Sequence, residues 1–159
     1  MDKPSHDNAS GSPLEQAGLD GFAPYLMNRI MGRYNAALSA EMAALGLTTP
    51  QMRSLAVLSV TDGILIRELA VYAVVQQSTL SRALDALVRD GLVRRETDAN
   101  DSRATRVYLT DQGREAYARL WPHMAQAYEA MFKGIGPEEK AAFVATLQTM
   151  LRNIRKHDF

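Results

Sequence analysis

The sequence contains no cysteine and no net charge, since 18 Lys and Arg residues balance 18 Asp and Glu residues in a chain of 159. Without cysteine, disulfides, thiolate zinc sites, iron–sulfur clusters and cysteine-based redox sensing are all excluded. The chain also lacks an apolar run of about 18 residues, so no transmembrane helix is expected. The first twenty residues have no apolar core of the kind that signal peptides carry. These absences predict a cytoplasmic protein of ordinary globular composition.

Signals of catalysis are missing as well. His6, His123 and His157 are scattered along the chain, and the sequence has no metalloprotease, phosphate-loop or nucleophile-elbow motif. We therefore expect no catalytic residue, no metal site and no cofactor. The neutral balance of charge also removes the simplest argument for nucleic-acid binding, which is a strong excess of basic residues. Any argument for nucleic-acid binding must therefore depend on where particular basic and polar residues lie along the chain.

The N-terminal third of the chain divides into a tail and two helices. Residues 1–20 are rich in small polar residues, Pro and Gly and have no periodic apolar face, which predicts a disordered tail. Apolar residues at helical spacing over 21–45 predict a long helix that ends at Gly46. Thr49 and Pro50 are typical of an N-cap and a first helical position, which opens a second helix that continues to Val60.

Two short helices and a hairpin follow. The pattern predicts a brief extended stretch and a helix over 64–73, a tight turn, and a second helix over 76–89. Residues 93–110 are rich in β-branched residues around the polar group 98–102, which predicts a β-hairpin with a longer loop. This order defines a mainly α (α+β) fold of the winged helix-turn-helix type.

Long helices flank this unit. One begins after the N-cap Thr110 and runs to about residue 133, with a kink or local break expected at Pro122, and the last begins at Pro137. Together with the helix 21–45 they carry more apolar surface than one small domain covers, which favours a homodimer over a monomer in which they pack only on each other. We therefore divide the chain into the tail, a DNA-binding domain over 48–110, and a helical dimerisation region over 21–47 and 111–159.

The helix 76–89 has the composition of a helix that contacts bases. Leu80, Leu84, Leu87 and Val88 are expected to face the core. The remaining face carries short hydrogen-bonding groups and an arginine, as major-groove recognition requires, although an ordinary solvated face has the same composition. The predicted DNA contacts on this helix are Gln76, Gln77, Ser78, Thr79, Ser81 and Arg82.

The hairpin adds arginines beside this helix. Arg94, Arg95, Arg103 and Arg106 lie within it, and an arginine at a hairpin tip is suited to the narrow minor groove. Asp101, two residues before Arg103, is expected to hold that guanidinium by a charge-assisted hydrogen bond, whereas the alternative is a surface ion pair of little consequence. From Arg67 to Arg106 there are seven basic and six acidic residues, so binding would depend on where the arginines point.

The segment 66–113 resembles the core of the MarR family of bacterial transcriptional regulators. The pair Asp101 and Arg103, followed by Val107, Leu109-Thr110 and Gly113, resembles that family's wing signature. The chain differs from the family at the turn between the two short helices, where Val74 stands in place of a frequent glycine and lacks glycine's conformational freedom. The N-cap of the following helix is Gln76, which is a weak capping residue.

The resemblance implies a homodimer that binds a pseudo-palindromic operator in double-stranded DNA, most often as a repressor. It also implies a small aromatic or phenolic effector held between the dimer helices and the DNA-binding lobe. Residues suited to line such a pocket are Tyr25, Met31, Arg53, Trp121 and His123, although side chains of these types more often serve packing or pairing. The alternative function is a winged-helix protein–protein adapter that binds no DNA. The salt dependence of duplex binding distinguishes the two.

Overall fold

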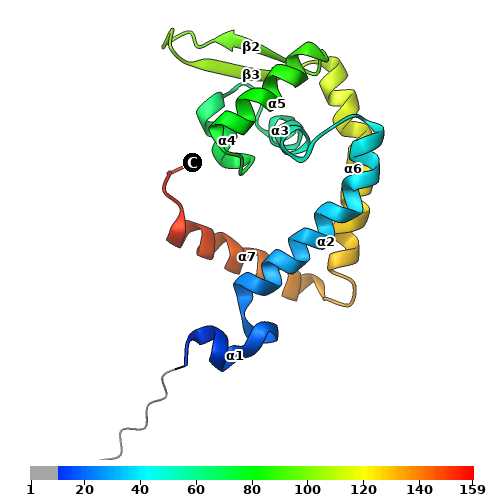
Figure 1. Cartoon of the computed structure of the whole chain (residues 1–159), viewed down its shortest axis with the longest axis vertical. Helices are drawn as coiled ribbons and strands as arrows, with labels where there is room; N and C mark the ends of the chain where they lie inside the picture. The colour runs from blue at the N-terminus through cyan, green and yellow to red at the C-terminus, as the bar shows by residue number, and fades with distance from the viewer. Residues whose placement is uncertain (1–10) are drawn as a thin grey trace, which may run out of the picture. The chain divides into compact units, whose positions relative to one another are not determined.

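The computed structural model describes residues 11–159, which form helices and one small sheet (Figure 1). The chain separates into two compact units, of which the first ends at Ala37 and the second comprises Leu38–Phe159. No helix in the described range is long and apolar enough to cross a membrane.

The N-terminal tail predicted over residues 1–20 is wrong for its second half, because helix α1 spans Pro13–Gly21. Ser12 and Glu15 form a capping box: the Ser12 hydroxyl accepts the N–H of Glu15 at 3.2 Å, and the Glu15 carboxylate accepts the N–H of Ser12. This local signature, with Pro13 at the first helical position, outweighs the polar composition on which the prediction depended. Residues 1–10 of the predicted tail lie outside the described residues.

Helices α2 (Ala23–Ala44) and α3 (Thr49–Val60) match their predicted extents closely. Gly46 has a φ of 66°, and the N–H of Leu47 donates to the carbonyl of Met42 at 2.8 Å, so α2 ends as predicted at a left-handed glycine. The N-cap of α3 is Thr48, one residue before the predicted Thr49, because Thr48 and Gln51 form a capping box.

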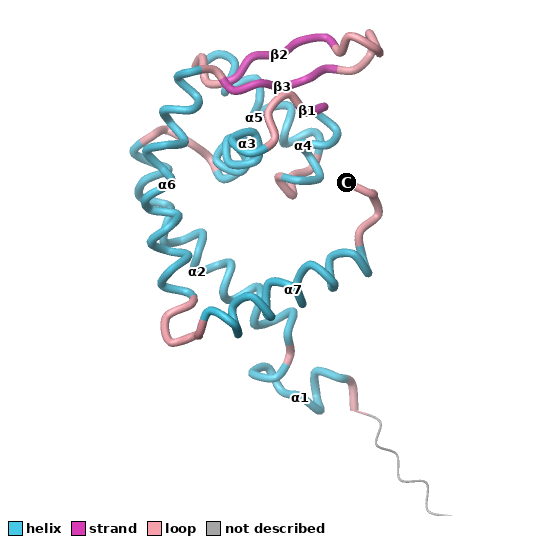
Figure 2. The backbone as a smooth tube through the Cα atoms, turned by 180° about the vertical axis from the view of Figure 1, so that it is seen from behind, coloured by secondary structure: helices cyan, strands magenta, loops and turns pink. Residues whose placement is uncertain are grey.

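The winged unit follows the predicted order. It consists of strand β1 (Ile64–Leu65), helices α4 (Ile66–Tyr72) and α5 (Gln77–Arg89), and strands β2 (Val93–Thr97) and β3 (Thr105–Leu109). The strands pair antiparallel in the order β1-β3-β2, and the β2–β3 hairpin extends beyond the helices beside it (Figure 2). The core of this unit is a set of fully buried side chains contributed by α3, α4, α5 and β3: Leu55, Leu58, Leu69, Leu80, Leu84, Leu87 and Val107.

The turn at Asp62 and Gly63 joins several elements of the second unit. One carboxylate oxygen of Asp62 accepts the N–H of Leu109 on β3 at 2.8 Å. The other lies 2.6 Å from the guanidinium of Arg114, in the first turn of helix α6 (Asp111–Met131). This turn is therefore a point of attachment for the central strand and for α6.

Helices α6 and α7 (Pro137–Ile154) complete the chain. Thr110 caps α6 as predicted, with its hydroxyl accepting the N–H of Gly113 at 3.0 Å. The helix is not broken at Pro122, which lies inside the continuous helix Asp111–Met131 and removes only its own backbone donor. None of the residues of α7 is buried, and its apolar side chains remain accessible.

Candidate nucleic-acid interface

The turn before α5 has the backbone of a Schellman motif. Val74 has a φ of 54°, its N–H donates to the carbonyl of Val71 at 3.1 Å, and the N–H of Val75 donates to that of Ala70 at 3.0 Å. The carbonyl of Val74 accepts a hydrogen bond from the Arg53 guanidinium at 3.4 Å. The chain therefore makes the turn with a β-branched residue where glycine is the usual solution.

Helix α5 has one buried face and one polar face. Leu80, Leu84 and Leu87 are fully buried, as predicted. The prediction for Val88 is wrong, since its side chain is 39% exposed. The buried face of the helix also includes Ala83. The centre of this face therefore lies further from Val88, which stands at its edge.

The predicted DNA contacts lie on the accessible side of α5. Thr79 is half-buried, and the others are exposed: Gln76, Gln77, Ser78, Ser81 and Arg82. Gln76 is the N-cap and makes no side-chain capping bond. These residues form the polar face, which presents hydroxyls, amides and a guanidinium at the N-terminal half of the helix.

A shallow groove separates the start of α3 from α5. Thr79, Ala83 and Ala86 are small side chains on the side of α5 that faces α3. The groove has a volume of about 330 Å³ and is lined by Thr48, Pro50, Gln51, Thr79, Arg82, Ala83 and Ala86. Sequence reasoning missed Thr48 as a residue beside the polar face, because the contact between α3 and α5 joins distant parts of the chain.

Arg103 presents its side chain at the tip of the hairpin. It is exposed, and its guanidinium has no ion pair or hydrogen bond with any residue in the range 11–159. Asp101 does not bind that guanidinium as predicted. Its carboxylate instead accepts the backbone N–H of Arg103 at 3.0 Å, a bond that aspartate readily forms two residues ahead in a turn. Asp101 therefore shapes the loop, and the Arg103 charge is left available.

The other three wing arginines have partners within the protein. Arg94 pairs with Glu96 and lies 4.3 Å from the centre of the Tyr108 ring. Arg95 lies 2.9 Å from the carboxylate of Asp85 on α5. Arg106 pairs with Asp98 and donates to the carbonyl of Gly63 at 2.7 Å. All three side chains remain partly accessible, and Arg106 differs in binding both Asp98 and the Gly63 carbonyl.

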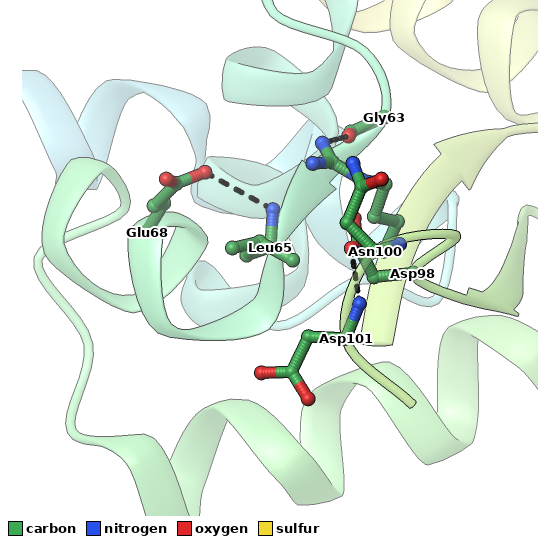
Figure 3. A network of polar contacts seen from close by, with 7 residues as sticks. Gly63, Leu65, Glu68, Asp98, Asn100 and Asp101 are labelled. Carbon is green, nitrogen blue, oxygen red and sulfur yellow. Dashed lines mark hydrogen bonds and ion pairs between the residues drawn. The ribbon is translucent and has the colours of Figure 1, made fainter. Parts of the chain in front are cut away.

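Asp98 organises the loop between β2 and β3 (Figure 3). Its side chain is 7% exposed, and one oxygen accepts the N–H of Asn100 at 2.9 Å and that of Asp101 at 3.0 Å, while the other pairs with Arg106. The bond from the Asn100 N–H and then the bond from Arg106 hold the pKa of Asp98 below its ordinary value. The same pair raises the pKa of Arg106. Sequence analysis predicted a turn here and did not identify Asp98 as its centre.

The residues predicted to line an effector pocket belong to different parts of the chain. Tyr25 and Met31 lie in the unit that ends at Ala37. Arg53 binds the Val74 carbonyl, and the His123 imidazole lies 3.3 Å from the carboxylate of Glu41. Trp121 is half exposed beside the ring of Tyr117. Over residues 11–159, no group of three histidine or acidic side chains is arranged to hold a metal ion.

A helix-turn-helix joined to a three-stranded sheet with a projecting hairpin defines a winged helix-turn-helix protein. A family model described as the MarR family matches residues 45–104, from the end of α2 to the wing loop. A crystal structure of a MarR family transcriptional regulator from Silicibacter pomeroyi is 60% identical, with a TM-score of 0.88 over 93% of this chain and 100% of that chain. The chain belongs to the MarR family of transcriptional regulators, whose members are not enzymes.

Two further relatives carry names that bear on function. The HTH-type transcriptional repressor IacR of Pseudomonas putida is 24% identical over 149 residues, which are 94% of this chain and 87% of that protein. The structure of BpsR from Bordetella bronchiseptica, whose DNA binding is regulated by 6-hydroxynicotinic acid, is 24% identical and has a TM-score of 0.69. It covers 80% of this chain and 97% of that chain, and at this identity it establishes a shared fold.

Proposed function

We propose that this regulator binds a pseudo-palindromic operator as a homodimer and represses transcription. In this proposal α5 lies in the major groove and Arg103 enters the adjacent minor groove. The observation that carries it is the contrast within α5, where Leu80, Leu84 and Leu87 are fully buried and the opposite face is polar and accessible. The name of IacR supports repression as the direction of control.

Exposed apolar side chains on α6 and α7 support the homodimer. Trp121 is 53% exposed, Phe143 44%, Leu151 61% and Ile154 78%. A folded monomer rarely leaves so many large apolar groups in water, and a second copy of the chain covers them symmetrically. We therefore keep 21–47 and 111–159 as the dimerisation region and 48–110 as the DNA-binding domain.

A small aromatic or phenolic effector is proposed to change the affinity for DNA. Support comes from BpsR, which responds to 6-hydroxynicotinic acid and shares the fold. Tyr25, Met31, Arg53, Trp121 and His123 remain the proposed lining residues. Anisotropy titrations of an operator complex with aromatic acids and phenols test this, and a change in operator affinity that saturates with ligand is the expected result.

The experiment that tests DNA recognition is selection of the purified dimer against random duplexes, followed by anisotropy titration at several salt concentrations. We expect an inverted repeat with half-sites about one helical turn apart. Affinity should fall steeply as salt rises, because phosphate contacts release counterions. If a folded dimer enriches no motif even at low salt, the proposal is wrong and a protein–protein adapter becomes the better explanation.

A further inference from the structure

Three helix ends in the second unit use the same Schellman geometry, but one of them lacks glycine. Gly46 after α2 and Gly91 after α5 have φ values of 66° and 73°. Val74 after α4 has a φ of 54° and is the one non-glycine residue with positive φ among residues 11–159. A β-branched side chain is strained in this region of backbone space, whereas glycine is not. The turn before the polar face is therefore made at a conformational cost that the other two avoid.

The side chain of Val74 does little to offset this strain. It is 77% exposed, so it gains little from packing. A strained backbone conformation persists only where surrounding groups fix it. The N–H of Val74 is bound by its own helix, which leaves its carbonyl as the group that the rest of the protein can hold.

Arg53 supplies that restraint from a different helix. It lies on α3, 21 residues before Val74 in the chain, and its guanidinium donates to the Val74 carbonyl at 3.4 Å. Helix α5 begins at Gln77, and its N-cap Gln76 makes no side-chain bond to the helix. The position of the first turn of α5 therefore depends on the preceding turn rather than on its own cap.

We infer that Arg53 is a positioning residue for DNA recognition: it holds Val74 in the left-handed conformation and so sets the start of α5. The inference depends on the proposed DNA binding for its functional consequence. It assigns Arg53 a role through the backbone of Val74, which needs no contact of its side chain with DNA. The polar face at Gln77, Ser78 and Arg82 moves when this restraint is lost.

The test is a cycle of four full-length proteins: wild type, Arg53→Ala, Val74→Gly and the double variant. Glycine removes the strain, so the variant with Val74→Gly no longer needs Arg53. Arg119→Ala, which removes an exposed arginine from α6, is the matched control for loss of charge. The measurements are hydrogen exchange at the amides of residues 74 and 75, and duplex affinity as a function of salt.

In the Val74 background, Arg53→Ala should speed exchange at these amides about tenfold and weaken duplex binding about fivefold. The salt slope should stay unchanged, and in the Val74→Gly background both losses should shrink to less than about twofold. Equal losses in the two backgrounds overturn the inference, as does a salt slope reduced by about one, which indicates a phosphate contact. If the wild type binds no duplex, the proposed function fails, and the exchange cycle alone still decides whether Arg53 restrains Val74.

Discussion

The guanidinium of Arg95 on β2 lies 2.9 Å from the carboxylate of Asp85 on α5, and it also donates to the carbonyl of Ser81 at 3.4 Å. One side chain therefore joins the wing to the helix that carries the polar face. The Asp85 side chain is 61% exposed, so the pair adds little to global stability. The Arg95–Asp85 pair instead affects the angle between the wing and α5, the two elements that we propose to contact DNA.

Arg103→Ala should weaken binding to every duplex by about tenfold and reduce the salt slope by about one, because Arg103 supplies charge without reading a base in the major groove. Anisotropy titrations on the operator and on unrelated duplexes measure both quantities. Arg103→Lys keeps the charge and should lose less. Equal affinities of wild type and Arg103→Ala at low salt would contradict the role of the wing.

Ser78→Ala and Arg82→Ala should instead reduce specificity. Each is expected to cost about 1–3 kcal/mol of binding free energy on the operator, at the base pairs that the lost group contacts. Affinity for unrelated duplexes should change much less than with Arg103→Ala. The measurement is a comparison across operator variants with one base pair changed at a time. A uniform loss across all duplexes would place these side chains on phosphates rather than on bases.

Stability at acid pH should depend on Asp98. Its pKa in the folded protein lies below the ordinary value of 3.8, chiefly because of the Asn100 N–H and then Arg106. The stabilisation is therefore present above pH 3.8 and is lost as pH falls through the lowered pKa. Urea unfolding at a series of acid pH values should show a steeper decline for the wild type than for Asp98→Asn. Parallel curves would contradict the prediction.

Gly113→Ala should destabilise the protein by at least about 3 kcal/mol. A Cβ at this position would lie 2.0 Å from the carbonyl oxygen of Leu92 and 3.0 Å from a methyl group of Leu109. The carbonyl cannot easily move, because it accepts the N–H of Thr110 at 3.1 Å. Urea midpoints measure the effect.

The matched control is Gly32→Ala, where an added Cβ meets no atom within 4 Å. Because alanine favours a helix interior over glycine, this variant should be neutral or up to about 1 kcal/mol more stable. A similar loss in both variants would show that the contact with Leu92 is not the cause.

Leu151→Glu should dissociate the proposed homodimer. The side chain is 61% exposed, and covering a leucine stabilises an interface by about 1.5–3 kcal/mol per copy, which a buried carboxylate would reverse. Sedimentation velocity measures the change in mass. Val60→Glu is the control, since Val60 is 83% exposed at the end of α3 and is not part of the proposed dimerisation region. A dimer that survives Leu151→Glu would exclude this face of α7 from the interface.

Local patterns in the sequence were sufficient for most elements of the winged unit. The spacing of Leu80, Leu84 and Leu87 predicted the buried face of α5, and Thr110 and Gly46 marked helix ends correctly. These features depend on residues within one or two turns of each other. The capping box of α1 is equally local, and composition alone led to the wrong expectation for Pro13–Gly21.

The roles of the arginines could not be obtained in the same way. Arg106 has partners at Asp98 and at Gly63, the latter 43 residues earlier, and Arg53 has its partner 21 residues later. Such pairs arise only when the chain is folded, so a list of basic residues in a hairpin cannot distinguish Arg103 from Arg106. The prediction for Asp101 failed for a more local reason. Its carboxylate accepts the backbone N–H of Arg103 instead of the guanidinium, because the nearest donor is the main chain.

The Asp62–Gly63 turn connects helix α6 to the central strand of the sheet. It holds β3 through Leu109 and Arg106, and it holds the first turn of α6 through Arg114. A rotation of α6 would therefore act on the hairpin through this turn, and α3, which contacts both α6 and α5, would carry the same movement to the helix with the polar face.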